Sequence, residues 1–101
     1  MVVIYKQPAD APAFDAHYFG VHVPLAKQLP GLRKYEVSRG PIISLTGGPS
    51  WHLVARLHFD DLAAIKAAFT TSVGQECAAD RRNLAPDDAD LTMLLFDAED
   101  V

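Results

Sequence analysis

The chain has 101 residues, 50% of them apolar and 22% charged, a composition typical of one globular domain that spans residues 1–101. Its formal net charge is −4 and its nine lysines and arginines are scattered, so we expect no nucleic-acid partner, because no basic stripe could follow a phosphate backbone. No apolar run approaches the roughly 20 residues of a membrane span, and the start does not resemble a signal peptide. The only cysteine, Cys77, fits a reducing compartment. We therefore expect a cytoplasmic protein that does not bind membranes.

The first predicted elements are a strand and a long helix. The strand covers residues 2–6, a β-branched and aromatic run, and it ends before Pro8 because proline cannot extend a ladder of backbone hydrogen bonds. Asp10 then offers a side-chain cap for a helix. The apolar stripe of this helix has steps of three and four and consists of Phe14, Tyr18, Val21, Leu25 and Leu29. Because Pro24 removes a hydrogen bond inside this pattern, we expect a kink or break between Gly20 and Pro24.

The rest of the chain predicts two strands, a helical region and a last strand. Residues 32–38 alternate weakly, and residues 51–59 alternate clearly. In the second of these strands one face carries Trp51, Leu53, Ala55, Leu57 and Phe59, and the other carries His52, Val54, Arg56 and His58. A helix with a break at Gly74 follows, with a shorter segment after that break, and residues 91–96 form the last strand.

The order strand, helix, strand, strand, helix, strand predicts an α+β protein with the ferredoxin-like βαββαβ fold, in which helices cover one face of an antiparallel sheet. The uncovered face would carry Arg56 and two histidines beside apolar residues, a mixture too apolar for water and too polar for a core. The sheet of a second copy would cover it. We therefore expect a homodimer that encloses a chamber for a small, apolar molecule.

Several motifs in the first third of the chain resemble those of the EthD family. They are Tyr5-Lys6-Gln7-Pro8-Ala9-Asp10, Ala13-Phe14, His17-Tyr18, His22-Val23-Pro24-Leu25-Ala26 and Leu29-Pro30-Gly31-Leu32-Arg33-Lys34-Tyr35. The resemblance implies the ferredoxin-like fold, paired as a dimeric α+β barrel. It implies less about chemistry, because related barrels include oxygenases, cyclases, isomerases and haem proteins.

Tyr18 and His22 are the predicted catalytic pair. They are one helical turn apart near the buried stripe, so both side chains can reach the edge of the chamber. Histidine exchanges a proton near neutral pH, and a tyrosine hydroxyl can polarise an oxygen, so the pair suits proton transfer beside a carbonyl. An alternative stays open, in which His22 only replaces hydrogen bonds lost at the proline.

Five further residues are predicted to bind the ligand. They are Tyr5, Tyr35, His52, Arg56 and His58. An inward Arg56 needs a carboxylate, a carbonyl of the partner chain or an anionic ligand oxygen, because an unpaired buried guanidinium is costly. No metal site is predicted, since His17 lies about 140° from His22 on a regular helix and the two strand histidines are roughly 20 Å apart. No bound cofactor is predicted either.

Two readings of function remain at this point. The first is an enzyme without a bound cofactor, of isomerase, cyclase or oxidoreductase type, that moves a proton on an apolar substrate. The second is a binding or accessory protein that delivers a hydrophobic metabolite to a partner oxygenase. A haem or flavin role ranks third.

Overall fold

The computed structural model describes all residues, Met1–Val101, and contains one four-stranded antiparallel sheet in the order β2-β3-β1-β4. The strands are β1 (Val2–Lys6), β2 (Lys34–Val37), β3 (Trp51–His58) and β4 (Leu91–Leu94). This is the expected ferredoxin-like βαββαβ arrangement. Three strands are shorter than predicted, because β2 does not include residues 32–33 or 38, β3 ends before residue 59, and β4 ends before residues 95–96.

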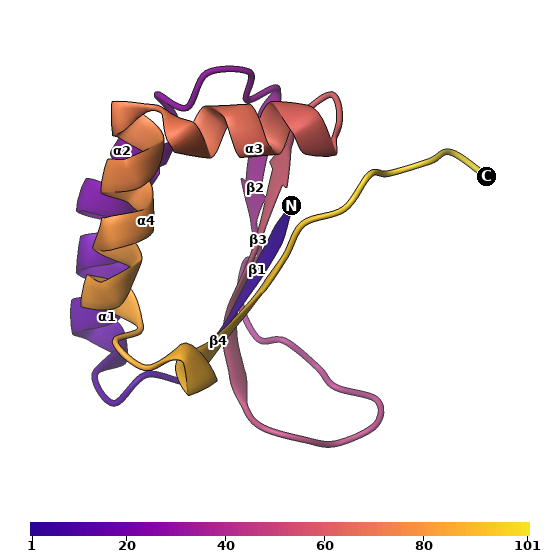
Figure 1. Cartoon of the computed structure of the whole chain (residues 1–101). Coiled ribbons are helices and arrows are strands. Elements are labelled where there is room, and N and C mark those ends of the chain that lie inside the picture. Colours follow the sequence, from indigo (N-terminus) through magenta and orange to yellow (C-terminus); the bar gives the residue numbers. More distant parts are fainter.

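The helices gather on one face of the sheet (Figure 1). They are α1 (Ala11–His17), the π-helix η1 (Tyr18–His22), α2 (Val23–Ala26), α3 (Leu62–Thr70), α4 (Ser72–Leu84) and the short 3-10 helix η2 (Asp88–Asp90). In Figure 1, α1, α2 and α4 cover the sheet and α3 crosses its end, whereas no helix covers the opposite face. None of these helices has the length and apolar character needed to span a membrane.

An aromatic cluster in the core joins β1 to the first helix. The rings of Phe14 and Tyr18 stack with centroids 5.8 Å apart, and Tyr5 meets both of them edge-on, at 5.2 and 5.8 Å. Such aromatic pairs contribute about 0.5–1.5 kcal/mol each beyond the area they bury. The cluster therefore fixes the position of the first helix over the centre of the sheet.

The predicted break in the first helix is confirmed, and it takes the form of a π turn. Across Tyr18–His22 the helix widens, and the backbone N–H of Val23 donates to the carbonyl of Tyr18, five residues earlier. Pro24 has no N–H to offer the carbonyl of Gly20, so the regular α-helical pattern of hydrogen bonds cannot continue here.

The π turn changes which residues face the core. Its extra residue advances the inward stripe by one position, so Ala26 is buried and the side chain of His22 is only 12% exposed. Val21 is instead 49% exposed, and Leu25 is half-buried. The predicted stripe was therefore wrong at Val21, whereas Leu25 still packs against the core, and the shift turns His22 towards the interior.

The predicted alternation of β3 was wrong for His52. The pairing register of β1 and β3 shifts between Tyr5 and Lys6, which marks a β-bulge that re-aims a side chain. The His52 ring lies edge-on to Phe14 with centroids 5.1 Å apart, and its Nε2 lies 2.7 Å from Oδ1 of Asp15. Both partners belong to α1, so His52 lies on the helix side of the sheet.

The break between α3 and α4 lies at Thr71, not at Gly74 as predicted. Thr71 has extended backbone angles, and its side chain caps α4 by accepting a hydrogen bond from the N–H of Gly74. A Cβ atom on Gly74 would lie 2.2 Å from the carbonyl oxygen of Ala68 and 2.5 Å from Cα of Phe69. Glycine is therefore required because the helices approach closely, and α4, with 13 residues, is the longer of the two.

Candidate functional site

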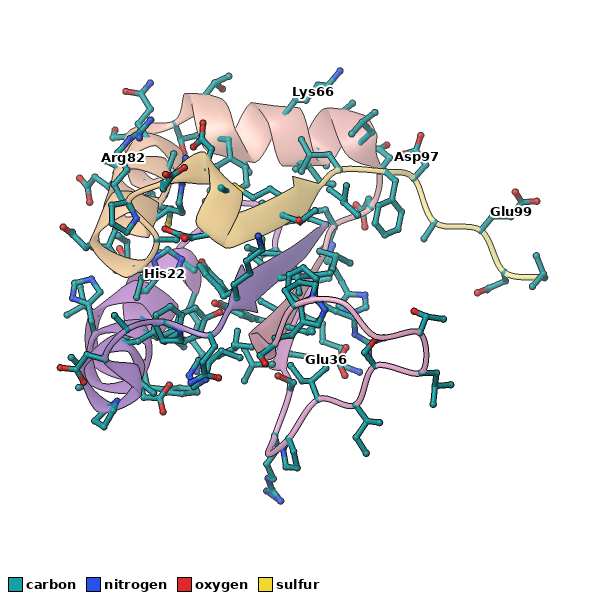
Figure 2. All side chains as sticks on the ribbon, turned by 90° about the horizontal axis from the view of Figure 1, so that it is seen from below. His22, Glu36, Lys66, Arg82, Asp97 and Glu99 are labelled. Carbon is teal, nitrogen blue, oxygen red and sulfur yellow. The ribbon has the colours of Figure 1, made fainter.

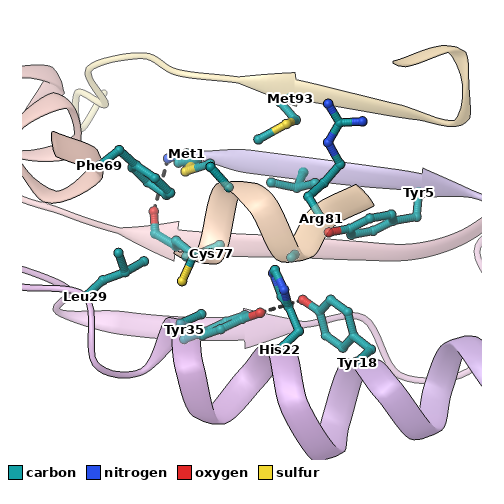
Figure 3. Close-up of a pocket in the computed structure, with 15 residues that line it drawn as sticks. Met1, Tyr5, Tyr18, His22, Leu29, Tyr35, Phe69, Cys77, Arg81 and Met93 are labelled. Atoms are coloured by element: carbon teal, nitrogen blue, oxygen red, sulfur yellow. Dashed lines mark hydrogen bonds between the residues drawn. The ribbon is translucent and has the colours of Figure 1, made fainter. Parts of the chain in front are cut away.

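A pocket of about 40 Å³ lies in the core, between the helices and the sheet (Figure 3). Of the 15 residues that line it 13 are hydrophobic, and its side chains with a polar atom or thiol are Tyr5, Tyr18, His22, Tyr35, Cys77 and Arg81. A space of this size holds water or the reacting end of a small ligand. Met93, which is 44% exposed, also lines the pocket, so its wall reaches the surface at the edge strand β4.

Two tyrosine hydroxyls in the pocket satisfy each other. The oxygens of Tyr18 and Tyr35 lie 2.6 Å apart, so one hydroxyl donates to the other, as the dashed line in Figure 3 shows. Burial raises the pKa of both phenols. Both therefore stay protonated near neutral pH, and neither acts as a base.

Tyr5 is the third tyrosine of the pocket. Its hydroxyl points into the pocket in Figure 3, and it forms no hydrogen bond with the protein. Burial is the main reason that its pKa is raised, so this hydroxyl also stays protonated.

His22 is the one histidine that lines the pocket. Its Nδ1 lies 2.8 Å from Oδ2 of Asp80 on α4, and its ring is tilted over Tyr18 with centroids 5.4 Å apart. Because an ionised carboxylate only accepts hydrogen bonds, Nδ1 is the donor of this contact. The other ring nitrogen, Nε2, has no partner within the protein, and the ring lines a mostly apolar cavity.

Asp80 holds a second histidine as well. Nε2 of His17 lies 2.8 Å from Oδ1 of Asp80, and Asn83 donates to the same oxygen at 3.0 Å. Burial opposes ionisation of Asp80, but the hydrogen bonds from Asn83, His22 and His17 together hold its pKa below the usual range. Sequence reasoning missed this residue. Asp80 follows Cys77 by about one helical turn, and this spacing was the signal that both side chains lie on the same, inward face of the helix.

The remaining polar groups of the pocket carry no free charge. Burial is the main reason that the pKa of the Cys77 thiol rises to about 11, so the thiol is protonated near neutral pH. The guanidinium of Arg81 donates to the carbonyl of Ala85 at 3.0 Å and to Asp88 at 2.8 Å. Its charge is therefore paired with a carboxylate that lies at the surface.

The predicted ligand-binding residues do not share one chamber within the chain. Arg56 and His58 lie on the uncovered face of the sheet, and both contact Oε1 of Glu36, at 3.2 and 2.8 Å. Figure 2 shows Glu36 and His22 on opposite sides of the sheet. The prediction that Arg56 finds a carboxylate is confirmed.

The pocket therefore contains only part of the predicted set, because the sheet separates its two groups. Tyr5, Tyr18, His22 and Tyr35 come together, whereas His52 pairs with Asp15 away from the pocket. The structure contains no group of three or more His, Cys, Asp or Glu side chains arranged to hold a metal ion.

We compared the chain with known protein families, sequences and structures. The model of the EthD domain matches residues 6–88. An uncharacterised 11.0 kDa protein from the thcB-thcC intergenic region of Rhodococcus erythropolis is 39% identical over 102 residues, covering 100% of this chain and 95% of that protein. The crystal structure of an ethyl tert-butyl ether d (EthD) family protein from Bacillus halodurans C-125 is similar with a TM-score of 0.84 and 32% identity, covering 97% of this chain and 95% of the other.

Proposed function

This chain belongs to the EthD family, and from that starting point we propose that it binds a small, apolar metabolite between its helices and sheet, where His22 transfers a proton. The family name does not define a reaction, so the proposal rests on the site. The observation that carries it is the pairing of His22 with Asp80 at 2.8 Å beside an otherwise apolar pocket.

The geometry supports general base chemistry at Nε2 of His22. In the neutral tautomer this nitrogen can accept a proton from a ligand, and the Asp80 carboxylate then stabilises the positive charge on the ring. The apolar lining strengthens this interaction, because water does not screen it. A positioned general base typically accelerates proton transfer by about 10²–10⁴-fold. The reaction requires no bound cofactor.

We further propose that a second copy of the chain covers the open face of the sheet. Leu94 is 49% exposed on that face and Phe96, just beyond the strand, is 46% exposed. The ionic cluster of Glu36, Arg56 and His58 lies on the same face. Apolar residues beside paired charges are typical of a surface that associates with a partner.

Proton transfer can be tested by solvent deuterium exchange into the carbon beside the carbonyl of 2-butanone, followed by NMR. We expect the wild-type protein to accelerate exchange over buffer and His22→Gln to lower the rate by about 100-fold or more. His58→Gln is the matched control, because that histidine lies on the opposite face of the sheet, and it should exchange at the wild-type rate. Equal rates for wild type and His22→Gln would falsify the proposed base.

The composition of the pocket also supports a second candidate, a carrier that delivers a hydrophobic metabolite to a partner oxygenase. Since 13 of its 15 lining residues are hydrophobic, the pocket can hold a ligand without reacting with it. A carrier would bind 2-butanone equally well with His22 or Gln at that position and would show no exchange. The same two measurements therefore separate the two functions.

A further inference from the structure

Tyr5 carries the one tyrosine hydroxyl of the pocket that has no hydrogen-bond partner within the protein. Tyr5 is only 2% exposed, and Figure 3 shows its hydroxyl oxygen directed into the cavity. The hydroxyls of Tyr18 and Tyr35 are different, because they bind each other at 2.6 Å. Because no fully enclosed side-chain oxygen of the protein lacks a partner, the Tyr5 oxygen borders open space in the pocket, where it can bind an occupant.

We propose that the Tyr5 hydroxyl is the oxygen-binding donor of this site, and that the ligand is a neutral carbonyl compound with a hydrogen on the carbon beside the carbonyl. This inference rests on the proposed ligand site and adds to it the chemical class of the ligand. It also assigns the role of polarising the carbonyl to Tyr5 rather than to Tyr18, whose hydroxyl is held in a hydrogen bond with Tyr35.

The charges around the pocket favour a neutral ligand. A carboxylate ligand would need a free cation, but the guanidinium of Arg81 is paired with Asp88. Asp80 adds negative charge on the side of His22, which disfavours an anion further. A carbonyl oxygen instead needs only a donor, and Tyr5 supplies one.

Tyr5 and His22 line the same small pocket and contact the same tyrosine ring. Each packs on the ring of Tyr18, at centroid distances of 5.8 Å for Tyr5 and 5.4 Å for His22. The pocket of about 40 Å³ has room for a carbonyl and its neighbouring carbon, and the rest of a longer ligand would extend along Met93 towards the surface.

The proposed step is balanced in atoms and electrons. Nε2 of His22 takes the proton from the carbon, the electron pair of that C–H bond forms a C=C bond, and the π pair of the carbonyl moves to the oxygen. Tyr5 keeps its proton, and its hydrogen bond to the enolate oxygen is stronger than the bond to the original carbonyl. His22 then returns the proton to carbon, so nothing is oxidised or reduced.

The test measures the carbonyl stretching frequency and the affinity of 2-butanone labelled with ¹³C at its carbonyl, in wild type, Tyr5→Phe and the control His58→Gln, whose residue lies on the opposite face of the sheet. We expect the stretch of the bound ketone to move to lower frequency in wild type and in His58→Gln but not in Tyr5→Phe. The affinity should fall about two- to tenfold in Tyr5→Phe, as for loss of one hydrogen bond. Thermal unfolding of each variant confirms that it is folded.

The outcomes separate this inference from the proposed reaction. A carbonyl frequency and affinity that are the same in Tyr5→Phe and wild type would overturn the role of Tyr5, even if exchange depended on His22. A shift that depends on Tyr5 without any deuterium exchange would support the ligand class and would reject the proton transfer. Failure of the folded wild type to bind the ketone would overturn both.

Discussion

His22 donates a hydrogen bond from Nδ1 to Oδ2 of Asp80 at 2.8 Å, and this contact joins the π turn of the first helix to the middle of α4. The carboxylate sets the orientation and the tautomer of the ring, because it can only accept. Its other oxygen contacts His17 at 2.8 Å, which restricts rotation of the carboxylate. Asp80 is therefore the positioning residue of the candidate site.

Asp80→Asn should lower the rate of deuterium exchange into 2-butanone by about 100-fold or more, because an amide neither fixes the tautomer nor stabilises the charged ring. ¹⁵N NMR of His22 should show loss of the preference for hydrogen on Nδ1. Asp88→Asn is the control, since that exposed carboxylate binds Arg81 outside the pocket. An unchanged tautomer together with an unchanged rate would reject the positioning role.

The free energy of unfolding should depend on Asp80 in a pH-dependent way. Because the pKa of Asp80 is lower in the folded protein than its ordinary value of 3.8, the unfolded chain binds the proton more readily. The contribution to stability is therefore fully present above that ordinary value and is lost as the pH falls through the folded value. The difference in free energy of unfolding between wild type and Asp80→Asn, measured with urea, should be smaller at about pH 2.5 than at about pH 6. A difference that does not change with pH would contradict the lowered pKa.

Two glycines should respond in opposite ways to substitution by alanine. Gly74→Ala should destabilise the protein by about 2–4 kcal/mol, since its Cβ would lie 2.2 Å from the carbonyl oxygen of Ala68. Gly20→Ala should stabilise by about 0.5–1 kcal/mol, because nothing lies within 4 Å of the new Cβ and alanine favours helix. Urea denaturation measures both values. If Gly74→Ala were as stable as wild type, the close approach of the two helices would be wrong.

Filling the pocket should prevent ligand binding without unfolding the protein. Ala26 lines the pocket and is almost completely buried, so Ala26→Val places two methyl groups in a space of about 40 Å³. We expect a loss of stability of about 1–3 kcal/mol and a loss of affinity for 2-butanone of about tenfold or more. Ala16→Val, at an exposed position of α1, is the control for the lower helix propensity of valine. Equal ketone affinity in both variants would place the ligand elsewhere.

The open face of the sheet should govern self-association. Leu94→Glu places a charge on that face and should weaken a dimer by about 30-fold or more. Val21→Glu is the matched control, because Val21 has the same exposed fraction, 49%, on the helix surface. Sedimentation equilibrium over a range of concentrations measures both. A wild-type protein that stays monomeric at every concentration would exclude the proposed second copy.

The sequence by itself determined the order of the elements and the open sheet face. It also named Tyr5, Tyr18, His22 and Tyr35, which line the pocket, but it placed the ligand chamber on the open face of the sheet. Strand alternation and helix caps depend on neighbours within a few residues, so they can be interpreted locally; Asp10, for example, accepts from the N–H of Ala13 at 3.1 Å. The tyrosines of the pocket followed from the same patterns, since Tyr5 and Tyr35 fall on the core side of their strands.

The tertiary structure alone decided three features. The π turn sets which residues after Tyr18 face inward, the β-bulge directs His52 to α1, and Asp80 meets His22 from 58 positions further along the chain. A periodic pattern assumes a fixed number of residues per turn or per pleat, and one inserted residue changes every position after it. Contacts between distant segments depend on how whole elements pack, which no local pattern contains.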